Sequence, residues 1–303
     1  MRSYRFHTCD VFTATRFGGN QLAVLPDARG LTRAEMLAIA REFNYSESTF
    51  VLPPDDPTHT RRVRIFTPGG EVPFAGHPTV GTALVLAAIG DVALGGDETR
   101  IVLEEEVGPV PVTIRAEGGV AVSAEFATAR LPEVLPPSPP AESLAAMLSL
   151  GPDDLLGGAW HPQAVTCGLP FTFVPVRSRD AVRRARLRLE RWESTLSASP
   201  AHMVMVFAMD AEDPAHHVRA RMFAPGAGVP EDPATGSACA ALGGYLGLRD
   251  GTRTGTLHWV VEQGYEMGRP SIIRVSCDKQ AGAITAVRVG GAAVLVCSGD
   301  LRL

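Results

Sequence analysis

An internal repeat constrains the fold of this chain more than any other feature of its sequence. Residues 64–73 read Arg-Ile-Phe-Thr-Pro-Gly-Gly-Glu-Val-Pro, and residues 221–230 read Arg-Met-Phe-Ala-Pro-Gly-Ala-Gly-Val-Pro. Six of ten positions are identical at an offset of 157 residues, where about one match is expected by chance. The segments 77–83 and 232–238 then share Pro, Gly and Ala. This spacing indicates a duplicated domain, whose two copies we expect to be related by a pseudo-twofold axis.

A proline-rich segment divides the chain near its middle. Five of the nine residues 132–140 are proline, which no helix or central strand tolerates. We therefore predict a stiff linker over 132–140. It separates an N-terminal domain, residues 1–131, from a C-terminal domain, residues 141–292. The length of 303 residues suits two domains of about 150 residues each.

Each half combines strands with one helix that is apolar on every side. Alternation and β-branched content predict first-half strands over 4–11, 21–25, 48–52, 61–66, 99–104 and 110–115. The second-half strands are predicted over 171–176, 203–209, 218–223, 272–275, 284–289 and 293–297. The apolar helices are predicted over 78–89 and 233–246, closed by Gly90 and Gly247. Such helices must be buried all round, so we expect an α+β fold with a curved sheet or barrel around each.

Two further helices have local signals. Thr32 and Glu35 form a capping-box pattern that predicts a helix through Phe43. Residues 182–192 have an apolar stripe, and the opposite face carries five arginines. That face could contact nucleic acid, but the net charge is −5 and no recognition motif accompanies it, which favours a solvated face.

The two repeated turns carry the strongest chemical signal. In each turn a polar residue, His77 or Asp232, is followed by proline and a helix of small residues. The small residues leave the first backbone amides of the helix uncovered, and such a helix end attracts anions. We predict a small carboxylate as ligand, because neither turn has a Walker or dinucleotide-binding pattern. Two ordinary capped helices are the alternative.

Glu47 is the candidate general acid/base. It precedes an apolar strand and shares a face with uncharged residues, so burial would raise its pKa toward neutrality. A single glutamate at the start of a strand is more often exposed and inert.

Composition excludes several other classes of protein. Lys279 is the only lysine, which leaves one candidate at most for Schiff-base or pyridoxal-phosphate chemistry. The five cysteines are widely spaced and form no CxxC pair, which argues against disulfides and structural zinc. His216 and His217 follow three acidic residues, but a surface loop is a better interpretation than a metal site.

No apolar run is long enough to span a membrane and the N-terminus lacks a signal-peptide core, so we expect a cytoplasmic protein.

At this point the motifs resemble those of the PhzF family, the phenazine-biosynthesis isomerases, which have a diaminopimelate-epimerase-like fold. The similarity rests on Asp-Val-Phe-Thr at 10–13, Gly-Asn-Gln-Leu-Ala-Val at 19–24, Tyr-Ser-Glu-Ser-Thr-Phe at 45–50 and the two repeated turns. These motifs occur in order, and the match extends to the C-terminus.

The resemblance implies a cofactor-independent isomerase with its active site between two similar domains. The last strand, about 293–303, is expected to return to the first domain, and the protein is expected to be a homodimer. By similarity, Glu47 shuttles a proton on a small, cyclic amino or hydroxy carboxylate. His77 and Asp232 contact the polar groups of the substrate. Its carboxylate is held around Ser46, Gly76, Gly236 and Ser237.

One departure from the wider superfamily favours a single base. Racemases of this fold use two opposed thiols, and the matching positions here are Ala75 and Ala234. Two-base racemisation is therefore not expected, and an isomerisation on one face is favoured. A lyase or hydratase built on the same glutamate and a non-catalytic binding protein remain alternatives.

Overall fold

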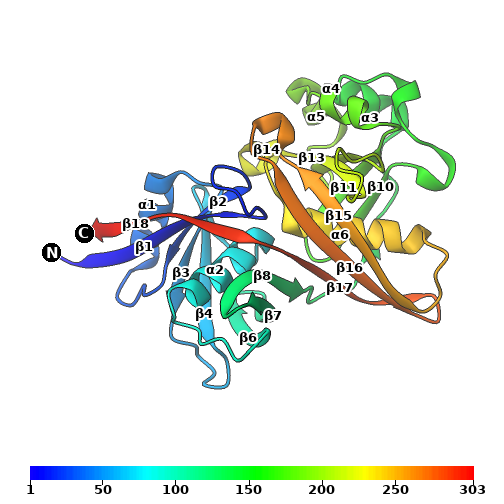
Figure 1. Ribbon diagram of the computed structural model, residues 1–303. Coiled ribbons are helices and arrows are strands. Elements are labelled where there is room, and N and C mark those ends of the chain that lie inside the picture. Colours follow the sequence, from blue (N-terminus) through cyan, green and yellow to red (C-terminus); the bar gives the residue numbers. More distant parts are fainter. The chain divides into compact units, whose positions relative to one another are not determined.

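The computed structural model describes all 303 residues, which divide into two compact units (Figure 1). The first unit comprises residues 1–127 and 290–303, and the second comprises residues 128–289. The proline-rich segment lies within the second unit, where two of its residues form a short strand. No helix of the chain is long and apolar enough to cross a membrane.

The first unit is a curved sheet with one buried and one peripheral helix. The helices are α1 (Arg33–Phe43) and α2 (Gly76–Ala88). The strands are β1 (Ser3–Val11), β2 (Asn20–Leu25), β3 (Glu47–Leu52), β4 (Arg61–Thr67), β5 (Gly70–Val72), β6 (Glu98–Glu105), β7 (Gly108–Glu117), β8 (Val120–Ala127) and β18 (Ala293–Arg302).

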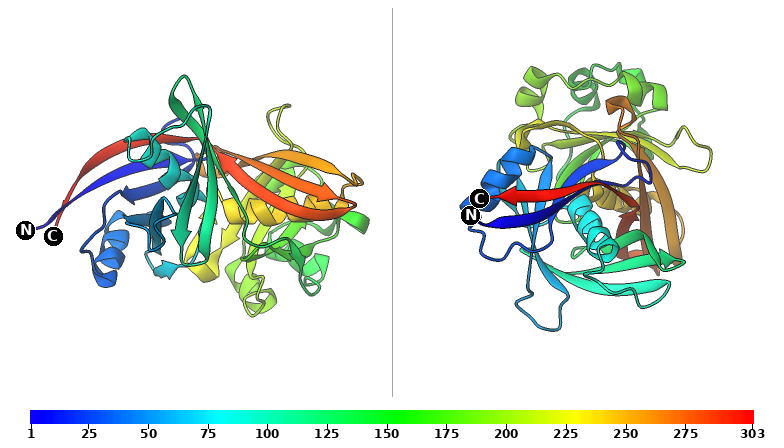
Figure 2. Two further views of the ribbon diagram at one scale, coloured as in Figure 1. Left: turned by 90° about the horizontal axis from the view of Figure 1, so that it is seen from below. Right: turned by 60° about the vertical axis from the view of Figure 1, so that its left-hand side comes forward.

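Strand pairing joins the two ends of the chain. β18 pairs antiparallel with β1 over its whole length, so the termini lie side by side (Figure 2). β1 pairs with β2, and β2 then runs parallel to β3. β3 pairs antiparallel with β4, which runs parallel to the first strand of the β6–β7–β8 meander.

Helix α2 is the buried helix of this unit. Twelve of its thirteen residues are buried, as expected for a helix that is apolar all round. It contacts β1, β2, β3, β7 and β8. A Cβ on Gly81 would lie 2.6 Å from side-chain atoms of Leu22 and Val11, so the absence of a side chain there permits the close approach of helix and sheet. The last residue of the helix is Ala88, Ile89 is its C-cap residue, and Gly90 follows with a φ of 81°.

Helix α1 confirms the capping signal. Thr32 accepts a hydrogen bond from the Glu35 amide, and the Glu35 carboxylate accepts one from the Thr32 amide. Asn44 ends the helix in the left-handed conformation, with a φ of 53°. Met36, Ile39 and Ala40 are buried in the core beneath the helix.

The second unit repeats this plan with additional helices. Its helices are α3 (Ala141–Met147), α4 (Arg179–Arg184), α5 (Leu189–Thr195) and α6 (Gly236–Arg249). Its strands are β9 (Glu133–Val134), β10 (Gln163–Thr166), β11 (Pro170–Pro175), β12 (Met203–Ala208), β13 (Val218–Ala224), β14 (Val229–Asp232), β15 (Gly255–Gln263), β16 (Ser271–Gln280) and β17 (Ala283–Gly291), the last two residues of which belong to the first unit.

Two helix predictions in this half are wrong. Helix α6 runs from Gly236 to Arg249 and not from 233 to 246. Gly247 does not adopt the left-handed conformation that would end the helix, and its missing side chain leaves room for Cys277, whose Sγ a Cβ would meet at 2.8 Å. The single helix expected over 182–192 is two short helices, α4 and α5. Between them Ala185 turns away from helical geometry, and its carbonyl accepts a hydrogen bond of 2.6 Å from Arg221 Nη1.

The strand register shows how far the duplication extends. β4 meets β6 through Arg61↔Leu103 and Arg62↔Glu104. β13 meets β15 in the same parallel sense through Val218↔Val261 and Arg219↔Glu262. The last residues of β6 and β15, Glu105 and Gln263, therefore occupy equivalent positions in the two halves.

Candidate active site

Glu47 is the first residue of β3, and its strand is anchored to the buried helix. It lies opposite Leu22 of β2 in the parallel pairing. Two residues along β3, the hydroxyl of Thr49 is 2.8 Å from that of Thr82 on α2, and both residues are fully buried. The Glu47 side chain is 18% exposed, so it reaches a partly desolvated position from a fixed strand.

His77 lies beside Glu47 in the first turn of α2. Its Nε2 atom is 3.4 Å from Oε2 of Glu47, and its side chain is 5% exposed. Its Nδ1 atom is 3.2 Å from Nδ2 of Asn20, the first residue of β2. The structure thus brings the predicted base and the predicted histidine together and adds Asn20 as a second ring contact.

The imidazole of His77 is neutral at neutral pH. Burial lowers its pKa to about 3, and a hydrogen bond with the Gln21 backbone opposes this shift only in part. A neutral imidazole offers one donor and one acceptor nitrogen. It therefore adds no positive charge next to the Glu47 carboxylate.

The residues around this pair form an open helix end. Gly76 is the first residue of α2, and no side chain caps the helix at Ala75. The first turn contains no acidic residue, so the partial positive charge of the helix end is not neutralised locally. Ser46 is half-buried and directly precedes Glu47.

The other three predicted residues lie in the second unit. Asp232 ends β14, and its Oδ2 atom accepts a hydrogen bond from the Thr235 hydroxyl. Gly236 and Ser237 are the first two residues of α6, again without a side-chain cap. Gln263 supports this turn, because its Nε2 atom donates to the Asp232 carbonyl at 2.8 Å and to the Thr235 hydroxyl at 2.9 Å.

No thiol lies at either helix start. Ala75 is the N-cap residue of α2, and Ala234 precedes the N-cap residue of α6. Cys239 is fully buried within α6, and burial raises the pKa of its thiol. Neither helix start therefore supplies a thiolate.

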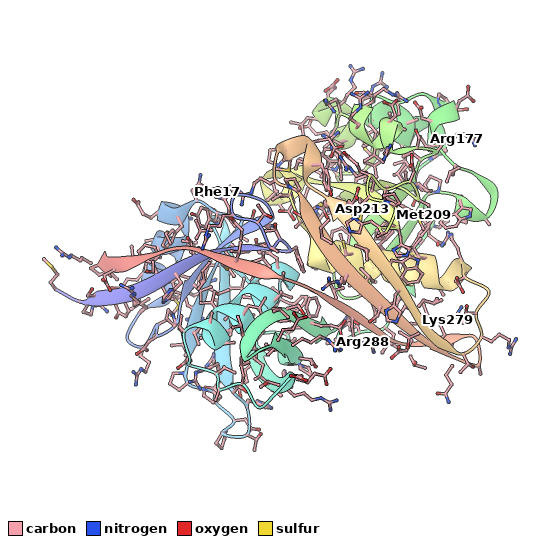
Figure 3. All side chains as sticks on the ribbon, viewed as in Figure 1. Phe17, Arg177, Met209, Asp213, Lys279 and Arg288 are labelled. Carbon is pink, nitrogen blue, oxygen red and sulfur yellow. The ribbon has the colours of Figure 1, made fainter.

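Lys279, the only lysine, has a structural role. Its Nζ atom donates to the carbonyl oxygens of Gly247 and Asp250, at 2.9 and 2.7 Å, and so satisfies the C-terminal end of α6. It lies near the end of β16 (Figure 3).

His216 contacts the buried carboxylate of Glu262 at 2.8 Å. No group of three or more His, Cys, Asp or Glu residues is arranged to hold a metal ion.

Sequence reasoning missed three polar residues near α2: Asn20, Thr79 and Glu105. Asn20 stands in the Gly-Asn-Gln-Leu-Ala-Val motif at 19–24, but nothing in the motif distinguishes it from its neighbours. Thr79 is one of several small residues at the start of the helix, and its sequence context gives it no separate role. Glu105 is the middle residue of Glu104-Glu105-Glu106, a run typical of a solvated surface, yet it is 7% exposed.

The fold and the motifs together point to one family of proteins. A family model described as phenazine biosynthesis-like protein (PhzC-PhzF) matches residues 9–299. The chain belongs to this family of isomerases, and its fold is of the diaminopimelate-epimerase-like type.

Individual relatives agree with this assignment. The chain is 42% identical to an uncharacterized isomerase of Mesorhizobium japonicum, with 99% of each chain covered. It is 34% identical to the trans-2,3-dihydro-3-hydroxyanthranilate isomerase of Pseudomonas aeruginosa, with 95% of each covered. The crystal structure of a PhzF-family phenazine biosynthesis protein of Bacillus anthracis matches with a TM-score of 0.89 and 26% identity, over 100% of both chains.

Proposed function

We propose that the chain is a cofactor-independent isomerase that moves a proton on a small carboxylate, with Glu47 as its general acid/base. The pairing of Glu47 with the buried, neutral His77 carries this proposal. A carboxylate beside a cation would lose basicity, whereas a carboxylate beside a neutral imidazole keeps it. Arg64 and Glu71 of the same unit, by contrast, form an ion pair.

The proposed reaction needs one base on one face of the substrate. Glu47 removes a proton from a carbon that neighbouring unsaturation makes acidic, and the electron pair shifts along the conjugated system. Glu47 then returns the proton to another carbon, so the double bond moves and no atom is gained or lost. General acid/base catalysis of this kind contributes about 10²–10⁴-fold to the rate.

Binding of the substrate falls to the neighbouring polar groups. His77 and Asp232 would contact its polar substituents. Backbone amides and hydroxyls at Ser46, Gly76, Gly236 and Ser237 would hold its carboxylate, since helix N-termini favour anions. The placement of this substrate between the two halves and the homodimer remain predictions. The cytoplasmic location remains a prediction from the sequence.

The name of the relative from Pseudomonas aeruginosa, a trans-2,3-dihydro-3-hydroxyanthranilate isomerase, supports the proposed substrate class. We propose a cyclic amino or hydroxy carboxylate with a carbon–carbon double bond next to the acidic carbon. Trans-2,3-dihydro-3-hydroxyanthranilate is therefore the first probe to use.

A solvent-exchange assay tests the proposal and separates it from a lyase. The protein is incubated in D₂O with this probe and with a panel of cyclic and acyclic amino and hydroxy acids, and products are followed by mass. An isomer differs in mass from its substrate only by deuterium, whereas a lyase product is lighter by the eliminated group. The proposal would be contradicted if the protein bound a panel member but neither exchanged protons with nor converted any member of the panel.

A further inference from the structure

A buried chain of oxygen atoms lies at the N-terminal end of α2. The Thr79 hydroxyl oxygen is 2.8 Å from the carbonyl oxygen of Ala75 and 2.6 Å from Oε1 of Glu105. Thr79 has a single hydroxyl hydrogen, and a carbonyl oxygen can only accept. If that hydrogen bonds Ala75, the shorter contact with Glu105 requires a hydrogen that Glu105 supplies.

We propose that Glu105 is a protonated carboxylic acid at neutral pH, which donates a hydrogen bond to Thr79 and thereby positions the first turn of α2, the turn that carries His77. Glu105 is thus a positioning residue and does not contact substrate. Its protonation is independent of the proposed function, and only its effect on turnover rests on that function.

The surroundings of Glu105 suit a neutral acid. The residue is 7% exposed, and its Oε2 atom is buried with no hydrogen-bond partner. An ionised carboxylate left in this state would be costly, because a buried charge needs hydrogen-bond donors or a counter-ion. Burial raises the pKa of Glu105 to about 8, although a hydrogen bond that Thr79 donated to the carboxylate would lower it.

The positively charged side chains around Glu105 are paired with other carboxylates and so do not stabilise its ionised form. Glu105 borders a polar pocket of about 610 Å³ within the first unit. Six of the titratable side chains around this pocket form three pairs: Arg62 with Asp55, Arg64 with Glu71, and His59 with Glu104. The seventh, Glu106, is exposed and lies near Arg64. The titratable group on α2 itself is His77, which is neutral.

The second half of the molecule has a comparable contact, in which a glutamine stands at the position of Glu105 and contacts Thr235, a residue one position further along than the counterpart of Thr79. Gln263 ends β15 where Glu105 ends β6. Its Nε2 atom donates to the Thr235 hydroxyl at 2.9 Å, and that hydroxyl donates in turn to Asp232. A glutamine cannot ionise, so this strand end acts as a neutral donor to a threonine at a helix start. Glu105 meets the same requirement only when it is protonated.

Infrared spectroscopy tests the protonation directly. In D₂O at pD 7, the wild-type protein should show a protonated-carboxyl C=O band that Glu105→Gln lacks and Glu106→Gln retains. The band should disappear as the pD rises through about 8. Circular dichroism should first show that both proteins are folded. The proposal would then be overturned if the difference spectrum of wild type minus Glu105→Gln contained no such band.

The positioning role has a readout that does not depend on turnover. The ring ¹⁵N resonances of His77, assigned with His77→Asn, should shift between pH 7 and 9.5 in the wild type and stay constant in Glu105→Gln. If these resonances do not move while the infrared band titrates, Glu105 is protonated but does not position His77.

Turnover gives the final comparison. One pH unit above a pKa of about 8, roughly a tenth of Glu105 remains protonated, so exchange by the wild type at pH 9 should fall about tenfold. Glu105→Gln should keep its rate over this range, and Glu106→Gln should follow the wild type. If the exchange rate falls equally in all three proteins at pH 9, a group other than Glu105 causes the pH effect. If none of the three exchanges substrate protons at any pH, the result contradicts the proposed function and leaves the protonation of Glu105 to the infrared measurement.

Discussion

The Nε2 atom of His77 lies 3.4 Å from Oε2 of Glu47. Strand β3 fixes the carboxylate and the first turn of α2 fixes the imidazole, and the buried Thr49–Thr82 contact joins these two elements. The pair therefore depends on the packing of α2 against the sheet. Because the imidazole is neutral, the arrangement is a single carboxylate with a polar neighbour and not an ion pair.

The burial of His77 should make the stability of the protein depend on pH. The pKa of His77 is about 3 in the folded chain and 6.5 in the unfolded chain, so the unfolded chain takes up a proton first as the pH falls. The contribution of His77 to stability should decline below pH 6.5, by at most about 1.4 kcal/mol per pH unit. Urea unfolding should show that the free energy of unfolding of the wild type falls by about 2 kcal/mol relative to that of His77→Asn between pH 7 and pH 5.

Exposed His161 provides the control for this measurement. His161→Asn should keep the pH dependence of the wild type. Equal pH dependence in the wild type and His77→Asn would show that His77 is not desolvated as the structure describes.

Glu105 should act on stability in the opposite direction. Its pKa is raised from 4.5 to about 8, so the unfolded chain loses the proton first and stability falls as the pH rises from 4.5 to 8. Between pH 5 and pH 7, the free energy of unfolding of Glu105→Gln should rise by about 2.5 kcal/mol relative to that of the wild type. Thermal unfolding across this range checks the sign, and a gap that shrinks with rising pH would disprove it.

The close packing of α2 can be tested at Gly81. A side chain there would overlap Leu22 and Val11, and overpacking of a well-packed core costs about 1–3 kcal/mol. Gly81→Val should lower the free energy of unfolding by about 3 kcal/mol. Gly70→Val is the matched control, because nothing lies within 4 Å of a Cβ at that position. Equal losses in the two variants would refute the close approach.

Lys279 should matter for stability but not for chemistry. Lys279→Met removes two hydrogen bonds to the end of α6 and should lower the free energy of unfolding by about 2 kcal/mol. The folded variant should exchange substrate protons at the wild-type rate. Loss of exchange in a folded Lys279→Met protein would restore Schiff-base chemistry as an explanation.

Local sequence signals were enough for much of the fold. The Thr32–Glu35 capping box and the apolar character of the buried helices are local signals, and the start of α1 and the burial of α2 follow from them. The bounds of α6 do not follow from such signals, because a glycine ends a helix only where it adopts a left-handed conformation, and Gly247 does not. The break between α4 and α5 depends on Arg221, a residue of another strand.

The same distinction applies to the candidate site. Glu47 and His77 stand in motifs, and the structure brings them together. Asn20, Thr79 and Glu105 gain their importance from contacts between segments far apart in the sequence. A run of three glutamates does not reveal that its middle carboxyl is buried, since strand alternation decides which side chain faces the core.

The most direct test of the central claim is the exchange of substrate hydrogen with D₂O by Glu47→Gln. This change preserves the shape of the side chain and removes the base, while Glu42→Gln alters an exposed glutamate of α1 as a control. With trans-2,3-dihydro-3-hydroxyanthranilate or another panel member that the wild type converts, we expect Glu42→Gln to exchange at the wild-type rate. Glu47→Gln should lose at least about 10²-fold, and exchange by Glu47→Gln at the wild-type rate would contradict the account.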